Sequence, residues 1–235
     1  MPVAIITGAS RGLGFALAQA LSTEGWDLVI DARDASLLAA AASQLGPGAV
    51  RAVPGDVADA AHRADLVAAA VDLGGLDLLV NNASVLGPSP QPRLADYPLD
   101  VLAQVYEVNA LAPLALVQRA LPVLRKRVGV VVNITSDAAV EPYEGWGGYG
   151  SSKAALEQVA NVLAAEEPRV QVYTFDPGDM RTQMHQAAFP GEDISDRPEP
   201  ETVVPSLLRL LHDAPPSGRY RVSDFAPAPS AAVGS

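Results

Sequence analysis

Short apolar runs alternate with longer segments rich in alanine and leucine along most of this chain. The apolar runs have the length of strands, and the segments between them have the length of helices. Ala4–Ile6, Leu78–Val80 and Val130–Val132 are apolar at every position, which is typical of parallel strands covered by helices on both faces. The pattern therefore predicts repeated βαβ units around one parallel sheet, an α/β fold.

The rhythm predicts seven strands and six helices. The strands are expected at Val3–Thr7, Leu28–Ala32, Ala49–Pro54, Leu76–Asn81, Gly129–Thr135, Val170–Phe175 and Arg219–Val222. The helices are expected at Leu13–Glu24, Ala35–Leu45, Ala58–Leu73, Leu99–Arg127, Ser151–Glu166 and Thr202–Asp213.

The chain of 235 residues suits one large domain, and no linker interrupts residues 1–225. Residues 184–200 break the rhythm with several prolines and carboxylates, so we expect this insertion to form a lid over a substrate. The Ala/Pro/Ser-rich tail at 226–235 is expected to be flexible.

Composition excludes several kinds of site. The absence of cysteine excludes disulfides, thiolate nucleophiles and Cys-based metal sites, and the three histidines are too widely spaced for a metal motif. A net charge of −11 argues against nucleic acid as a partner. The first residues do not have the basic start of a signal peptide, and no stretch approaches the roughly 18 apolar residues of a membrane span. We therefore expect a cytoplasmic protein without a membrane partner.

Glycine-rich sequence follows the first predicted strand. Glycines at 8, 12 and 14 allow a tight turn and let a pyrophosphate approach the start of the next helix. Three glycines alone would also suit an ordinary turn, but this place between the first strand and an amphipathic helix is the one that dinucleotide binding requires. The residues expected to hold the cofactor here are Gly8, Ser10, Arg11, Gly12, Leu13 and Gly14.

Tyr149 and Lys153 are four residues apart in a predicted helical region, so they share one face. A neighbouring ammonium is expected to lower the pKa of the phenol from its usual value near 10, which suits a general acid. Ser136, 13 residues before Tyr149, follows the fifth strand and can donate to a developing oxyanion. A Tyr-x3-Lys pair alone is also common on helix surfaces, but the added serine makes the pattern specific.

Thr-Gly-x3-Gly-x-Gly near the N-terminus, followed by Ser-x12-Tyr-x3-Lys, resembles the short-chain dehydrogenase/reductase family. The resemblance implies a Rossmann-type, doubly wound parallel sheet of order 3-2-1-4-5-6-7. It also implies an oxidoreductase that transfers a hydride between a nicotinamide cofactor and a ketone, aldehyde or secondary alcohol. Asn109 matches the family's fourth catalytic residue, which anchors a water beside the lysine.

The resemblance implies further cofactor contacts. Ser84 stands where the family motif Asn-Asn-Ala-Gly has its last glycine, and Met180 replaces the valine of Pro-Gly-x-Val-x-Thr. Without the resemblance, Asp56 would be a helix cap. The added cofactor residues are Asp56, Val57, Asn82, Ala83, Ser84, Tyr149, Lys153, Pro177, Gly178, Met180 and Thr182.

The end of the second strand indicates which dinucleotide is bound. A carboxylate there accepts from the ribose of NAD, whereas arginine accommodates the 2′-phosphate of NADP. Ala32 occupies the position at which NAD-using relatives carry Asp, and it is followed by Arg33; Arg11 is a second nearby cation. We therefore expect NADP, although a strand that ended one residue earlier would place Asp31 at the ribose and favour NAD.

Trp146, Met184 and Phe189 are expected to line the substrate pocket. His185 could also bind substrate, but a single histidine beside an insertion is more often a surface residue. Residues 163–186 are similar to the sepiapterin reductase branch. In the family, the helices matching 99–127 and 151–166 form a four-helix interface, which implies a homodimer or homotetramer.

Two alternatives carry the same motifs. One is an epimerase or dehydratase of the extended branch, whose chains usually have a further substrate domain. The other is a non-enzymatic dinucleotide sensor, which typically lacks the tyrosine or the lysine. The complete set here favours the oxidoreductase.

Overall fold

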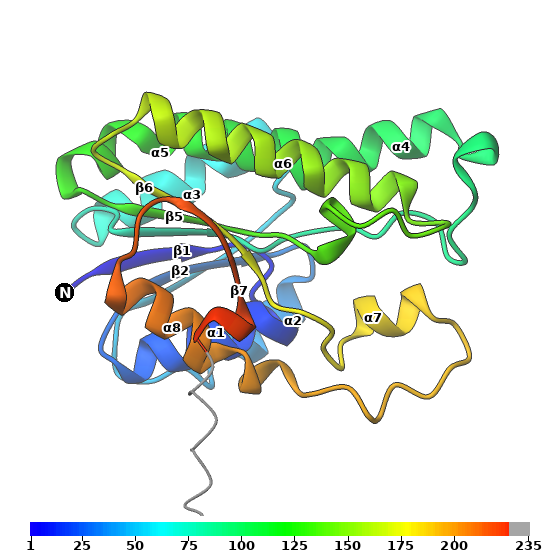
Figure 1. The fold of residues 1–235 in the computed structure, drawn as a ribbon. Coiled ribbons are helices and arrows are strands. Elements are labelled where there is room, and N and C mark those ends of the chain that lie inside the picture. The colour runs from blue at the N-terminus through cyan, green and yellow to red at the C-terminus, as the bar shows by residue number, and fades with distance from the viewer. Residues whose placement is uncertain (226–235) are drawn as a thin grey trace, which may run out of the picture.

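The computed structural model describes residues 1–225, which are built around one seven-stranded parallel sheet (Figure 1). The strands are β1 (Val3–Ile6), β2 (Asp27–Ala32), β3 (Val50–Pro54), β4 (Leu78–Asn81), β5 (Val130–Ile134), β6 (Gln171–Asp176) and β7 (Gly218–Arg221). Their order in the sheet is β3-β2-β1-β4-β5-β6-β7, and the expected topology is therefore confirmed.

Helices cover both faces of the sheet (Figure 1). One layer contains α3 (Ala60–Asp72), α4 (Leu99–Tyr106), α5 (Ala112–Arg127) and α6 (Gly147–Glu166). The other contains α1 (Gly12–Thr23), α2 (Ala35–Ala42) and α8 (Val204–Asp213). The short helix α7 (Gln183–Ala188) lies in the region expected to form a lid.

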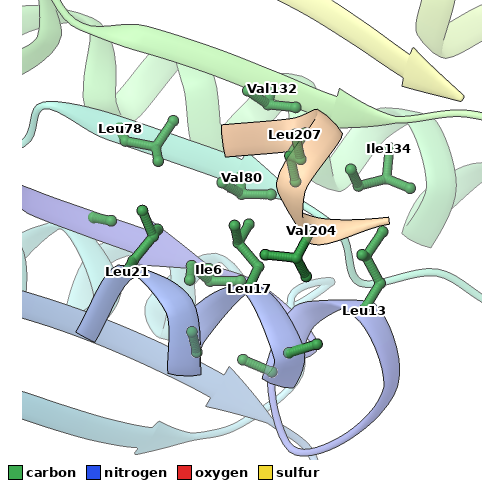
Figure 2. Close-up of a cluster of buried hydrophobic side chains, with 14 of the residues drawn as sticks. Ile6, Leu13, Leu17, Leu21, Leu78, Val80, Val132, Ile134, Val204 and Leu207 are labelled. Atoms are coloured by element: carbon green, nitrogen blue, oxygen red, sulfur yellow. The ribbon is translucent and has the colours of Figure 1, made fainter. Parts of the chain in front are cut away.

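Each face of the sheet has its own buried cluster. Ala4 and Ile6 of β1 pack with α1 and α8, while Val3 and Ile5 pack with α3 and α5. Successive side chains on a strand point to opposite faces, so the unbroken apolar run of β1 supplies both clusters. Figure 2 shows the first cluster, in which Leu17 and neighbouring side chains of α1 meet the strands and α8.

The predicted helix at Leu99–Arg127 is divided. α4 ends at Tyr106, a π-helical turn spans Glu107–Leu111, and α5 begins at Ala112. Pro113 has no amide hydrogen to donate to the preceding turn, which gives one physical reason for the change of helical pattern. Asn109 lies at the centre of the π turn, and such turns are frequent at functional sites.

The same region corrects the expectation that no stretch approaches the length of a membrane span. Leu99–Arg127 is long and apolar enough to cross a membrane by length and composition. Leu116, Val117 and Leu124 of this region are nevertheless buried against the sheet. They pack as the side chains of a core helix do.

The bounds of several other helices also differ from prediction. α6 begins at Gly147 rather than at Ser151, so Tyr149 lies inside the helix. α3 begins at Ala60, because Asp59 caps it by accepting from the amide of Ala61 at 2.8 Å. The tail expected at 226–235 lies outside the described residues.

The substitution Leu17→Ala tests the packing of the first cluster. Leu17 is 1% exposed, so its truncation is expected to lower the free energy of unfolding by about 2–5 kcal/mol. Urea denaturation without nucleotide measures the loss. Leu37→Ala, at a side chain 45% exposed on α2, is the matched control and should stay within about 0.5 kcal/mol of the unaltered chain. An equal loss in both variants would contradict this account of the core.

Candidate active site

The glycine turn between β1 and α1 is held by the loop after β4. Gly8 has φ of +66°, and a Cβ there would lie 2.9 Å from the Cα of Ala83. The Nδ2 of Asn82 donates to the carbonyls of Thr7 at 2.9 Å and Gly8 at 3.0 Å. A Cβ at Gly14 would lie 2.5 Å from that same Nδ2. Both glycines are therefore required by close packing in the turn.

The start of α1 differs from the starts of α2 and α3. Asp34 caps α2 and Asp59 caps α3 through side-chain hydrogen bonds. Arg11, at the same position before α1, makes no side-chain cap, and the first turn contains no acidic residue. The first amides of α1 are thus left without a capping side chain, and such amides bind anions.

A buried pair beneath this turn settles the position of Asp31. Asp31 is 1% exposed; one carboxylate oxygen accepts from the Gly8 amide at 2.7 Å, and the other lies 2.9 Å from the Nε2 of His62. Since β2 continues to Ala32, the one-residue shift that would free Asp31 for a ribose does not occur. His62, to which the sequence assigned no partner, completes this pair.

One cleft of about 1790 Å³ runs from the glycine turn to α7. It contains all of the site residues expected from the sequence except Gly14 and Asn109, which lie behind its wall. The expected residues that line it are Gly8, Ser10, Arg11, Gly12, Leu13, Arg33, Asp56, Val57, Asn82, Ala83, Ser84, Ser136, Trp146, Tyr149, Lys153, Pro177, Gly178, Met180, Thr182, Met184 and Phe189.

Ser136, Tyr149 and Lys153 all line the inner part of this cleft. Ser136 follows β5, accepts from the Ala138 amide at 3.2 Å, and donates to Asp137 at 3.0 Å. The Nζ of Lys153 donates to the carbonyl of Ile134 at 2.8 Å and lies 5.6 Å from the centroid of the Tyr149 ring. A strand end and one face of α6 therefore place the three groups along the same cleft.

The pKa values in this group differ from the sequence expectation. Burial raises the pKa of Tyr149 above its usual value near 10, as do the charges of Asp176 and Asp137, while a hydrogen bond with Ser84 lowers it. The lowered pKa expected for Tyr149 is therefore not found, because burial disfavours the charged phenolate. Burial lowers the pKa of Lys153 to about 8, against the opposing effect of Glu157.

Asn109 joins the loop after β4 to α6. Its Oδ1 accepts from the hydroxyl of Ser84 at 3.0 Å and the amide of Val85 at 2.9 Å. Its Nδ2 donates to the carbonyl of Val85 at 2.9 Å and to the hydroxyl of Ser152 at 3.0 Å. The serine that replaces the family's glycine thus gains a partner within the site.

Aromatic side chains line the outer part of the cleft. The ring of Trp146 lies edge-on to Tyr149 at 5.8 Å and is 5.9 Å from Phe189. His185 packs 4.9 Å from Phe189, and its side chain is only 10% exposed, near Asp179. The expectation of a surface histidine is therefore wrong. The amide of His185 donates to the hydroxyl of Thr182, which caps α7, at 3.1 Å.

Arg219 is a site neighbour that the sequence analysis missed. It lies on β7 and donates to the carbonyl of Ser136 at 3.2 Å from a position 83 residues away in sequence. A charged residue in a strand near the end of the chain was the only sequence signal for it.

Comparisons with known proteins agree with this geometry. The profile of the short chain dehydrogenase family matches residues 2–193. The chain is 37% identical to the sepiapterin reductase of Bos taurus over 201 residues, which cover 78% of this chain and 74% of the bovine protein. It is 35% identical to a rhamnolipids biosynthesis 3-oxoacyl-[acyl-carrier-protein] reductase of Pseudomonas aeruginosa over 192 residues, 77% of this chain and 74% of that protein.

A solved structure extends the likeness to almost the whole fold. An alcohol dehydrogenase from the archaeon Thermococcus sibiricus, complexed with 5-hydroxy-NADP, superposes with a TM-score of 0.85 at 26% identity, over 97% of this chain and 99% of that one. The matching profile, relatives and sheet order confirm the resemblance drawn from the motifs. The chain belongs to the short-chain dehydrogenase/reductase family of oxidoreductases.

Proposed function

We propose that this oxidoreductase uses NADPH to reduce a ketone or aldehyde, and that it oxidises the corresponding secondary alcohol in the reverse direction. The observation that carries the proposal is one cleft that contains both the glycine turn and the group Ser136, Tyr149 and Lys153. A dinucleotide held at the turn would extend along the carboxyl ends of the strands toward that group.

The residues of the turn fit a nicotinamide dinucleotide. The uncapped start of α1 offers amides to a pyrophosphate. Arg11 and Arg33 are exposed where the cleft passes the end of β2, and the carboxylate of Asp31 is already engaged. These features favour the 2′-phosphate of NADP over the ribose of NAD. The related alcohol dehydrogenase complexed with 5-hydroxy-NADP supports the same choice.

Side chains of the protein donate the proton to the substrate's carbonyl oxygen and stabilise the charge that develops on it. When bound, the nicotinamide supplies or accepts the hydride. Tyr149, whose raised pKa keeps it protonated at neutral pH, gives its hydroxyl proton to the carbonyl oxygen. Ser136 donates a hydrogen bond to the same oxygen, and charged Lys153 stabilises the tyrosinate that forms. Asn109 ties the loop after β4 to α6, the helix that carries Tyr149 and Lys153.

The substrate side suits an aromatic or extended ketone. Trp146, Met184 and Phe189 offer apolar surface beside Tyr149, and such walls with a few polar groups are typical of small-molecule sites. Residues 184–200 are proposed to close over the substrate. Two relatives whose names describe reductases, the sepiapterin reductase and the 3-oxoacyl-[acyl-carrier-protein] reductase, are consistent with a carbonyl substrate.

We also propose a homodimer or homotetramer formed through α4, α5 and α6, acting in the cytoplasm. Leu99, Leu111 and Val162 are exposed on this side of the fold, at 76%, 51% and 45%. Large exposed apolar side chains on neighbouring helices favour association.

Tyr149→Phe is expected to retain the fold and NADPH binding but to lose turnover by about 10²–10⁴-fold, because the proton donor is removed. Oxidation of NADPH in the presence of a ketone panel measures turnover, and fluorescence titration measures binding. Tyr106→Phe removes a hydroxyl outside the cleft and should retain activity. Normal turnover in Tyr149→Phe would exclude Tyr149 as the acid, and an inert unaltered chain that binds NADPH tightly would favour a sensor.

The rate of reduction is expected to fall above about pH 8, where Lys153 loses its proton and no longer stabilises the tyrosinate. Below that pH Lys153 keeps its charge and stabilises the tyrosinate fully. A profile of kcat/KM for ketone reduction between pH 6 and 10 measures the descending limb. Lys126→Met, which removes an exposed lysine, is the control and should show the same descending limb of kcat/KM as the unaltered chain. A profile that stays flat to about pH 10 would contradict the lowered pKa.

Arg33→Asp is expected to lower the preference for NADPH over NADH by at least about tenfold, because a charge-assisted bond to the 2′-phosphate is replaced by repulsion. Ratios of kcat/KM for the two cofactors measure it. Arg51→Asp makes the same charge change at an exposed residue outside the cleft and should leave the ratio unchanged. If both variants retain the original ratio, Arg33 does not reach the phosphate.

A further inference from the structure

The guanidinium of Arg219 connects four elements directly behind the inner part of the cleft. Its Nε donates to Glu157 of α6 at 3.0 Å. Its Nη2 donates to Asp176 at the end of β6 at 2.9 Å and to the carbonyl of Ser136 after β5 at 3.2 Å. Arg219 itself belongs to β7. One side chain from the edge strand thus reaches the backbone of the proposed oxyanion donor.

Each carboxylate of this cluster has a second partner. Glu157 also accepts from the hydroxyl of Thr135 at 2.6 Å, in the residue just before Ser136. Asp176 also accepts from the amide of Gly178 at 3.0 Å, in the turn proposed to contact the cofactor. Their side chains are 11% and 6% exposed, and that of Arg219 is 21% exposed. The cluster is therefore largely shielded from water, where a charged hydrogen bond is strong.

Charge links this cluster to the reacting groups. Glu157 lies one helical turn after Lys153 and raises the pKa of Lys153, while Asp176 raises the pKa of Tyr149. One arginine stands between the two carboxylates, which leaves the cluster with one net negative charge. Although burial lowers the pKa of Arg219, its bonds and attraction to Glu157 and Asp176 raise that pKa above its usual value. Arg219 therefore stays charged and offsets one of the two carboxylates.

We infer that Arg219 is a positioning residue, which fixes the backbone of Ser136 and the turn at Asp176 and offsets the negative charge behind Lys153. The inference rests on the proposed function, because it assigns a supporting residue to the same site. Arg219 itself does not line the cleft, so it acts through the groups that it holds. Lys suits this place less well than Arg, since an ammonium does not present a planar fork to two carboxylates and a carbonyl together.

The alternative is a purely structural ion pair between the sheet and α6. Both accounts predict some loss of stability when Arg219 is removed, so stability alone does not separate them. Only the positioning account predicts that turnover falls in protein that is still folded, and that the pH profile moves. The carboxylates that raise the pKa values of Lys153 and Tyr149 are Glu157, Asp176 and Asp137, and Arg219 is bonded to Glu157 and Asp176.

The test compares Arg219→Met, Arg219→Lys and the double variant Arg219→Met/Glu157→Gln with the unaltered chain. In Arg219→Met, kcat for ketone reduction is expected to fall between about tenfold and a hundredfold while KM for the ketone changes little, because reacting groups are misplaced. Kd for NADPH, from calorimetry, is expected to rise about threefold to tenfold as the Gly178 turn loosens. For both quantities, Arg219→Lys is expected to give values between those of Arg219→Met and the unaltered chain.

The pH profile separates charge from geometry. Removal of Arg219 leaves two uncompensated carboxylates, so the descending limb of kcat/KM is expected to move upward by about one pH unit. The double variant restores one net negative charge, so the descending limb of kcat/KM should return to its original position. Its kcat should stay low, because the carbonyl of Ser136 still lacks the hydrogen bond from Arg219. Arg221→Met, at an exposed residue of the same strand, is the matched control and should change none of these values.

Thermal unfolding shows the folded fraction of each variant at the assay temperature. The inference would be overturned if folded Arg219→Met had the same kcat, the same Kd for NADPH and the same descending limb as Arg221→Met. It would also be overturned if the activity lost in Arg219→Met matched the fraction of that variant that is unfolded. Failure of the proposed function looks different, because the unaltered chain itself would then reduce no ketone or aldehyde in the panel. In that case the ratio of Kd for NADPH between Arg219→Met and the unaltered chain still decides whether Arg219 supports the turn.

Discussion

The site depends on the hydrogen bonds that Asn82 makes to the carbonyls of Thr7 and Gly8. These bonds join the loops that leave β1 and β4, two neighbouring strands from which the chain continues in opposite directions across the sheet. Adjacent loops that diverge at such a point leave a crevice at the carboxyl ends of the strands. The side-chain amide of Asn82 bonds the two loops together at the base of this crevice. The other residues of the cleft lie along the crevice.

Much of the fold follows from patterns that are local in sequence. Apolar runs covered on both faces predict parallel strands, and β1 shows why, since its residues pack alternately into two clusters. The glycine turn and the spacing of Ser136, Tyr149 and Lys153 are likewise local, and these residues, apart from Gly14, line one cleft. The division of the helix at Asn109 was not predicted, because apolar periodicity does not report where a helix changes from α to π hydrogen bonding.

Contacts between segments that lie far apart in the sequence could not be predicted. The pair Asp31 and His62 spans 31 residues, and Arg219 reaches Ser136 across 83. Neither has a spacing that marks it, because the fold alone brings such residues together. The pKa of Tyr149 could not be predicted for a related reason. The spacing to Lys153 is visible in the sequence, but the burial that raises the pKa of Tyr149 is a property of the packed protein.

The bond from the Gly8 amide to Asp31 has a consequence for ligand entry. It fixes the conformation of the loop through the protein's own groups, before any phosphate arrives. A ligand that binds there meets backbone groups that the protein already holds in place, so less interaction energy is spent on ordering the loop. Recognition at this end of the cleft therefore depends on complementarity of shape and charge to a loop that is already ordered.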